Sequence, residues 1–112
     1  MDLKPGTLRH LQEYIHEQSI KRGFADETAE EQLIILVEEI GEIAKAYRKN
    51  TGMYVSSSDQ GKDNEDIGQE VADVINMLFA FATSMGIDIE RSFLEKEVKN
   101  TQRTYERAEN KG

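Results

Sequence analysis

The sequence predicts an all-α fold in which four helices pack as a bundle. Apolar residues recur at helical spacing in four segments, and no stretch shows the alternation of apolar and polar residues typical of a β-strand. The single proline and most of the glycines fall between these segments. A chain of 112 residues can bury one hydrophobic core but not two, so we expect residues 1–112 to form a single domain.

The first two helices have recognisable start signals. We expect the first helix to run from Thr7, whose hydroxyl can cap it, to about Gly23. The second helix opens with a capping box, in which Thr28 is followed three residues later by Glu31. Helical spacing of its apolar residues continues to about Lys49.

The third helix is predicted from about Ile67 to Ser84, with Gly86 as a left-handed cap. Asp88 can cap the fourth helix, whose sequence becomes mostly charged toward its end. Residues 50–66 are polar and rich in Ser, Gly and Asp, and they form too long a segment for an ordinary helix connection. This composition predicts a long mobile loop, with closure over a ligand as the alternative.

Charge and composition exclude several classes of function. The chain carries 14 basic and 22 acidic residues, a net charge of −8, so it lacks long-range attraction for nucleic acid polymers or anionic membranes. It has no cysteine, which excludes disulfides and thiolate metal sites. Because no apolar leader or membrane-length apolar stretch is visible either, we expect a cytoplasmic protein.

Acidic residues lie next to apolar surface on the second helix. Glu39 and Glu42 are about 60° apart around the helix axis, so they share one side of it with apolar residues. Glu38 lies about 100° from Glu39 and can be exposed or reach the edge of the same site.

The third helix repeats this arrangement in a more apolar setting. Between positions 71 and 82 the only polar residues are Asp73 and Asn76, and a helix that is apolar nearly all round is expected to be buried. Glu70 lies one turn before Asp73 on the same side. Each of the two helices therefore presents two carboxylates spaced three residues apart.

A single such pair is usually solvent-exposed charge, or a favourable interaction with the start of a helix. Ion pairing is the main structural alternative, but the chain has no basic residue between positions 67 and 85. Two pairs on the two most apolar helices favour a site where carboxylate oxygens bind Mg²⁺ or Mn²⁺. A helical-bundle di-iron centre is disfavoured, because it needs two Glu-x-x-His motifs and the chain has one, Glu13 to His16.

Basic residues recur along the fourth helical segment at steps of three and four: Lys96, Lys99, Arg103 and Arg107. By itself this stripe is explained by solvated helical ion pairs, such as that of Glu95 with Lys99. Beside a carboxylate metal site, the same stripe is suited to binding the oxygens of a polyphosphate.

Together these residues resemble a known family. Glu38-Glu39-x-x-Glu42, followed after a loop by Glu70-x-x-Asp73, is similar to the EExxE…ExxD signature of the MazG-like all-α nucleoside triphosphate pyrophosphohydrolases. The segment "KEVKNTQRTY" resembles the K-x-x-K-N-x-x-R-Y ending common in that family. The resemblance extends from "LQEYIHEQSIKRGF" in the first helix to Tyr105, and the ordered combination is more specific than either acidic motif alone.

The resemblance implies hydrolysis of a nucleoside triphosphate between its α and β phosphates, which yields the monophosphate and pyrophosphate. Mg²⁺, or Mn²⁺ as a substitute, would be held by Glu39, Glu42, Glu70 and Asp73. Glu38 would either orient a ligand or act as a general base. The residues that match the basic ending, and would hold phosphate, are Lys99, Asn100 and Arg103, with Lys96 as a further candidate.

The resemblance also implies a homodimer or homotetramer that completes the bundle, and a role in nucleotide-pool house-cleaning. Two enzymatic alternatives stay open: a pyrimidine-specific hydrolase of dUTP or dCTP, and a phosphoribosyl-ATP pyrophosphohydrolase. A non-enzymatic acidic helical interaction module is a third. Some relatives place tryptophan near the base, which this chain lacks, leaving as aromatic candidates Tyr14, Phe24, Tyr47 and Tyr54.

Overall fold

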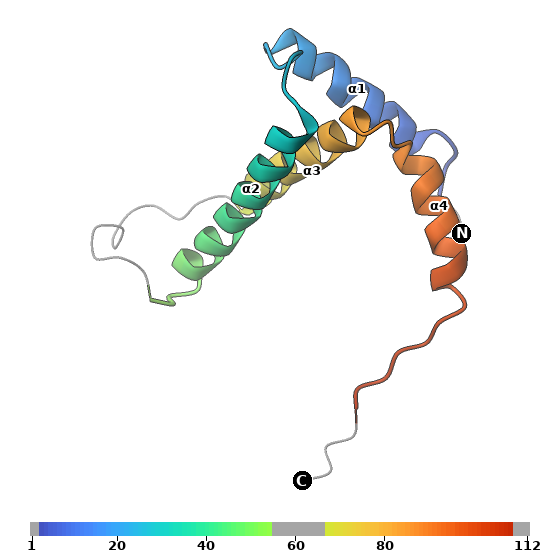
Figure 1. The fold of residues 1–112 in the computed structure, drawn as a ribbon. Helices are drawn as coiled ribbons and strands as arrows, with labels where there is room; N and C mark the ends of the chain where they lie inside the picture. The colour runs from blue at the N-terminus through green and yellow to red at the C-terminus, as the bar shows by residue number, and fades with distance from the viewer. Residues whose placement is uncertain (1–2, 55–66, 109–112) are drawn as a thin grey trace.

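A computed structural model of the chain describes residues 3–54 and 67–108 (Figure 1). Its helices are α1 (Thr7–Lys21), α2 (Ala29–Asn50), α3 (Ile67–Ser84) and α4 (Ile89–Asn100). These described ranges contain no β-strand, and the prediction of an all-α fold with four helices is confirmed. From position 55 onward, the predicted loop at 50–66 lies outside the described residues.

Three of the predicted helix boundaries are confirmed by their capping interactions. At the start of α2, the backbone N–H of Glu31 donates to the Thr28 hydroxyl and that of Thr28 donates to the Glu31 carboxylate, both at 3.1 Å. At the start of α4, the Asp88 carboxylate accepts from the backbone N–H of Arg91 at 3.1 Å. After α3, Gly86 has a φ of 70°, a conformation that glycine adopts without steric strain.

The predicted cap of α1 is wrong. Thr7 is the first helical residue rather than the cap, and its hydroxyl donates to the carbonyl of Lys4 at 2.8 Å. Gly6 occupies the cap position with a φ of 86° and offers no side chain. The open N–H groups at the start of α1 are instead bound by Glu90 of α4, a contact between residues too distant in sequence for a local motif to reveal.

Glu90 is buried, with 5% of its surface exposed. Its carboxylate accepts hydrogen bonds from the backbone N–H groups of Gly6 and Leu8 at 3.1 Å and of Arg9 at 3.4 Å. The guanidinium of Arg9 lies 3.8 Å from the same carboxylate. Charge-assisted bonds to the positive end of a helix are stabilising, so Glu90 fastens the first turn of α4 to the first turn of α1.

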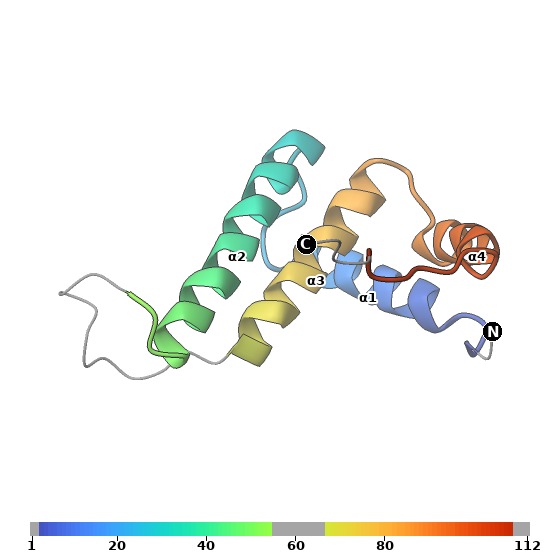
Figure 2. The same ribbon diagram turned by 90° about the horizontal axis from the view of Figure 1, so that it is seen from below.

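The helices form an open arrangement. α2 and α3 lie antiparallel side by side (Figure 2), α1 crosses α3, and α4 packs mainly against α1 (Figure 1). The radius of gyration is 18.2 Å, whereas a compact domain of this length has a radius of about 13 Å. The buried apolar side chains are accordingly few: Ile15, Leu36, Ala46, Phe79, Ala80 and Ala82.

The prediction that the third helix is buried all round is wrong for the single chain. α2 covers one side of α3 and α1 covers another, which leaves Val71, Ile75 and Leu78 exposed. Exposed apolar residues on α2 extend this surface: Leu33, Ile34, Val37, Ile40 and Tyr47. No single helix in the described ranges is long and apolar enough to cross a membrane; α3 and α4 pass that test only as a pair bent by 99°.

Candidate metal and phosphate site

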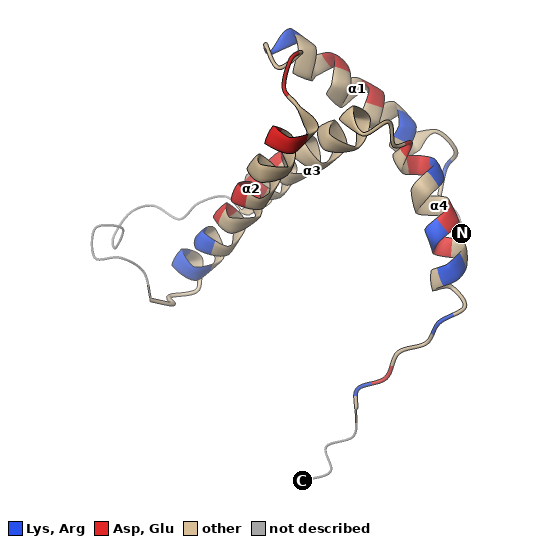
Figure 3. Ribbon diagram, viewed as in Figure 1, with Lys and Arg blue, Asp and Glu red and all other residues tan. Residues whose placement is uncertain are grey.

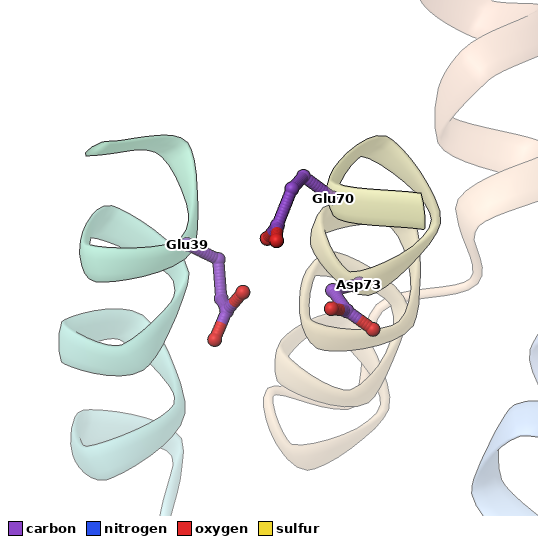
Figure 4. A group of neighbouring side chains, drawn as sticks. All are labelled: Glu39, Glu70 and Asp73. Atoms are coloured by element: carbon purple, nitrogen blue, oxygen red, sulfur yellow. The ribbon is translucent and has the colours of Figure 1, made fainter. Parts of the chain in front are cut away.

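The antiparallel pairing of α2 and α3 brings three of the predicted ligands together. Glu39 projects from α2 toward Glu70 and Asp73 of α3, and one carboxylate oxygen of each residue lies within 4.8 Å of the others (Figure 4). Glu70 and Asp73 share a face because they are three residues apart on one helix. Helical periodicity therefore places Glu70 and Asp73 on one face of α3. The packing of α2 against α3 then places Glu39 opposite them.

The surroundings of this carboxylate group are partly open to solvent. Glu39 and Glu70 are half-buried, whereas Asp73 is exposed, which corrects the expectation that the third helix, with Asp73 on it, is buried. The reason is that the face of α3 beside Asp73 is not covered within one chain. No ion pair involves Glu39 or Asp73 in the part of the chain that the structure describes.

This donor set fits a hard divalent cation. Like charges at such short separation repel one another, and a cation among them converts the repulsion into attraction. All the donors are carboxylate oxygens, which suit Mg²⁺ or Mn²⁺ better than the softer metals that prefer sulfur or imidazole. The geometry is therefore that of a candidate centre for a divalent metal.

Two predicted site residues lie outside this group. Glu42 is exposed, one turn beyond Glu39 on α2, and Glu38 is exposed on the neighbouring side of the same helix. Both stay close to the group along α2 but are not part of its mutual contacts. Their predicted roles, as a metal ligand and as a base or orienting residue, stay predictions.

The predicted phosphate-binding residues lie on α4 and just after it. Lys96, Lys99 and Asn100 are exposed on the helix, but α4 ends at Asn100, so Arg103 and Arg107 follow the helix rather than continue its stripe. The hydroxyl of Thr101 donates to the carbonyl of Val98 at 2.9 Å, a local bond that competes with the helical ladder. The prediction that the four basic residues form one stripe along a helix is therefore wrong, because the helix ends before Arg103 and Arg107.

One chain does not bring the basic and acidic residues together. α4 packs mainly against α1, and Figure 3 shows its charged bands on a different arm of the molecule from the acidic bands of α2. The sequence pattern predicts both sets of residues but contains no information on this separation.

A polar residue beside the acidic face was not among the predicted site residues. Gln32 of α2 is 5% exposed and lines a cavity between α1, α2 and α3. The sequence could have indicated this residue, because Gln32 precedes Glu39 by seven residues. It therefore lies two turns before Glu39 on the same side of the helix.

The helices and the carboxylate group define an all-α protein with a candidate divalent-metal centre. The chain belongs to the MazG nucleotide pyrophosphohydrolase family, since the model of that family's domain matches residues 18–107. The proposed resemblance is thereby confirmed. Enzymes of this family generally depend on divalent metals, in agreement with the acidic group of α2 and α3. No curated protein and no solved structure matches the chain.

Proposed function

We propose that this protein hydrolyses nucleoside triphosphates between the α and β phosphates, in the cytoplasm and with Mg²⁺, as part of nucleotide-pool house-cleaning. The observation that carries the proposal is the group formed by Glu39, Glu70 and Asp73, whose oxygens lie within 4.8 Å of one another. Membership of a nucleotide pyrophosphohydrolase family makes a metal-chelated triphosphate the ligand that best explains this concentration of negative charge.

In this proposal the carboxylates of α2 and α3 hold the cation, with Glu42 as an additional ligand. A bound Mg²⁺ would neutralise phosphate charge and polarise the phosphoryl oxygens. Glu38, exposed at the edge of the group, would accept the proton of the attacking water or orient a neighbouring ligand. Lys96, Lys99, Asn100 and Arg103 would donate hydrogen bonds to the remaining phosphate oxygens.

Such a site needs α4 from another copy of the chain, because α4 of the same chain packs against α1. The exposed apolar residues of α2 and α3 offer a surface for a homodimer or homotetramer. Burial of this surface would also explain why the single chain has so small a core. Light scattering coupled to gel filtration tests this: a dimer or tetramer is expected, and a monomer at micromolar concentration contradicts it.

The experiment that tests the activity is pyrophosphate release from a panel of nucleoside triphosphates, with Mg²⁺, with Mn²⁺ and with EDTA. We expect equal amounts of monophosphate and pyrophosphate, formed only with metal. The panel should include dUTP, dCTP, phosphoribosyl-ATP and oxidised nucleotides, so that its ranking identifies the substrate. A folded protein that releases nothing and binds no Mg²⁺ in calorimetric titration would instead be a helical interaction module.

A further inference from the structure

The joint between α3 and α4, residues 85–88, decides where the basic end of α4 lies. The two helices meet there with a bend of 99°, and α4 extends from the joint as a separate arm (Figure 1). Lys99 follows Ile89 by ten residues of helix, a length of about 15 Å, so a rotation of about 10° at the joint moves Lys99 by roughly 2.5 Å. Such a displacement breaks a charge-assisted hydrogen bond to phosphate, which forms at about 2.7–2.9 Å.

Apolar packing does little to hold this joint in place. Met85 and Ile87 have 55% and 38% of their surface exposed. A cavity of about 330 Å³ lies between the joint and α1 and is lined by residues of both. Segments with few buried apolar contacts are easily displaced, so the direction of α4 depends on hydrogen bonds at the joint.

Gln12 of α1 makes these hydrogen bonds. Its Nε2 atom donates to the carbonyl of Ile87 at 2.7 Å and to the hydroxyl of Thr83, on the last turn of α3, at 3.1 Å. Its Oε1 atom accepts from the backbone N–H of Ile89, the first residue of α4, at 3.0 Å. One half-buried amide thus binds the end of α3, the joint and the start of α4.

The hydrogen bonding of the backbone changes partner at the same place. The N–H of Ile87 donates to the carbonyl of Ala82 in α3 at 2.8 Å, whereas the carbonyl of Ile87 accepts from Gln12. Two residues later, the N–H of Ile89 also binds Gln12. Gln12 therefore bridges the point where the hydrogen bonds of α3 end and those of α4 begin.

Glu90 gives α4 a second attachment to α1. Its carboxylate binds backbone N–H groups of the first turn of α1, among them that of Leu8, whereas Gln12 lies one turn further along. A helix attached at a single point can pivot about that point, and a second attachment removes most of this freedom. The two contacts together hold the direction of α4.

We infer that Gln12 is a positioning residue, which holds Lys99, Asn100 and Arg103 where they meet the phosphates of a substrate bound at the carboxylate group of another copy. The inference rests on the proposed function, in which those three residues bind phosphate. In this arrangement Gln12 contacts neither metal nor substrate, and it acts through the direction of α4.

The first test measures the direction of α4 without any reaction. The chain has no cysteine, so Glu17→Cys on α1 and Glu95→Cys on α4 provide two unique sites for spin labels. Double electron–electron resonance, with labelled chains diluted into unlabelled ones, then measures the distance distribution between the two helices of one chain. Gln12→Leu should shift or broaden this distribution, because it removes the three hydrogen bonds with little change in volume.

A second variant and a control sharpen this test. Gln12→Glu should also shift or broaden the distribution, because a carboxylate cannot donate to the carbonyl of Ile87. Gln18→Leu is the matched control on α1, since Gln18 is half-buried like Gln12 and its side chain has no hydrogen bond among the described residues. A distribution that is unchanged in both Gln12 variants would overturn the inference.

The second test asks whether the direction of α4 matters to the substrate. Gln12→Leu should raise KM for the triphosphate about tenfold, like the loss of one charge-assisted phosphate contact. The affinity for Mg²⁺ in calorimetric titration should stay unchanged, because the acids of α2 and α3 are untouched. Lys99→Gln should raise KM by less in the Gln12→Leu background than in the wild type, because the displaced Lys99 has already lost its contact.

An unchanged KM in Gln12→Leu, or effects of the two substitutions that multiply in full, would show that Gln12 does not act through Lys99 and would overturn the inference. A lower melting temperature with an unchanged distance distribution and KM would leave Gln12 a structural role only, which also contradicts it. If the wild type releases no pyrophosphate, the proposed function fails, whereas the distance measurement still decides whether Gln12 holds the direction of α4.

Discussion

Carboxylates lie beside apolar surface in two regions of this protein, but their oxygens have different partners. At the junction of α1 and α4, Glu90 is 5% exposed and accepts hydrogen bonds from three backbone N–H groups. Between α2 and α3, Glu39 and Asp73 face a third acid and have no ion pair within the described ranges.

This difference separates a carboxylate that holds the fold together from carboxylates that we propose bind a metal ion. The protein itself satisfies Glu90, so removing it should damage the folded state. In the α2–α3 group, Glu39 and Asp73 have no ion pair among the described residues, so removing either of them should damage function and spare the fold.

The largest effect is expected in the α2–α3 group. Glu39→Gln and Asp73→Asn should each reduce pyrophosphate release more than about 100-fold, because each removes a charged ligand of the proposed metal site. In EDTA their melting temperatures should equal or exceed that of the wild type, since each substitution relieves repulsion. Glu17→Gln is the matched control, because Glu17 is an exposed acid of α1 that pairs with Lys21.

Thermal unfolding with and without Mg²⁺ provides the second readout. Mg²⁺ should raise the melting temperature of the wild type and of Glu17→Gln, but not of the two ligand variants. A large loss of stability in both variants in EDTA would mean that these acids are structural, and the contrast with Glu90 would disappear.

The next effect concerns stability at the α1–α4 junction. Glu90→Ala should lower the free energy of unfolding by about 3 kcal/mol, because it leaves three partly buried N–H groups without their charged acceptor. Glu90→Gln, which retains one oxygen acceptor, should fall between this variant and the wild type. Urea unfolding measures both, and Glu95→Ala is an exposed control on the same helix that should change little.

A smaller effect is expected for the basic residues at the end of α4. Lys99→Gln and Arg103→Gln should each raise KM about tenfold, because each would remove one charge-assisted contact with a phosphate oxygen. Arg91→Gln, whose guanidinium binds Glu95 at 3.0 Å on the same helix, is the control and should leave KM unchanged. Unaltered KM in both test variants would mean that the substrate does not contact α4, and would remove the argument for a second copy at the site.

The smallest effect concerns the capping box. Thr28→Ala should destabilise the protein by about 1 kcal/mol. Hydrogen bonds from the backbone N–H and then the hydroxyl of Thr28 lower the pKa of Glu31 below its ordinary value of 4.5. A lowered pKa in the folded state stabilises the protein above the unfolded-state pKa, and this contribution is lost as the pH falls through the folded-state pKa.

The prediction can be checked by carboxyl nuclear magnetic resonance between pH 2 and 7. Glu31 should titrate below 4.5 in the wild type and closer to its ordinary value in Thr28→Ala, whereas Thr104→Ala, in the exposed segment after α4, should change neither Glu31 nor stability. An unshifted Glu31 in the wild type contradicts the capping box.

Features that depend on a few neighbouring residues could be predicted from the sequence. The structure has the capping box at Thr28, the Asp88 cap and the left-handed Gly86 at the positions that the local sequence predicted. The pairing of Glu70 with Asp73 on one face follows from helical period alone. Each of these features is decided within about one helical turn, so distant contacts do not alter it.

Two of the failures involve contacts between distant segments. Thr7 is not the cap of α1 because Glu90, far along the chain, binds the same N–H groups. α3 is not buried all round because the other helices of the chain do not cover every side of it. The end of α4 at Asn100 was also not predicted, because basic residues can recur at helical spacing in a segment that is not helical.

By itself, the sequence determined the four helices, most of their ends, the family and which acids share a helix face, because these depend on local periodicity and motif spacing. Only the tertiary structure decided that Glu39 meets Glu70 and Asp73, that α4 packs against α1, and that Gln32 lines a cavity. Those outcomes depend on how whole helices pack, and packing is settled by the sum of many contacts rather than by any one segment.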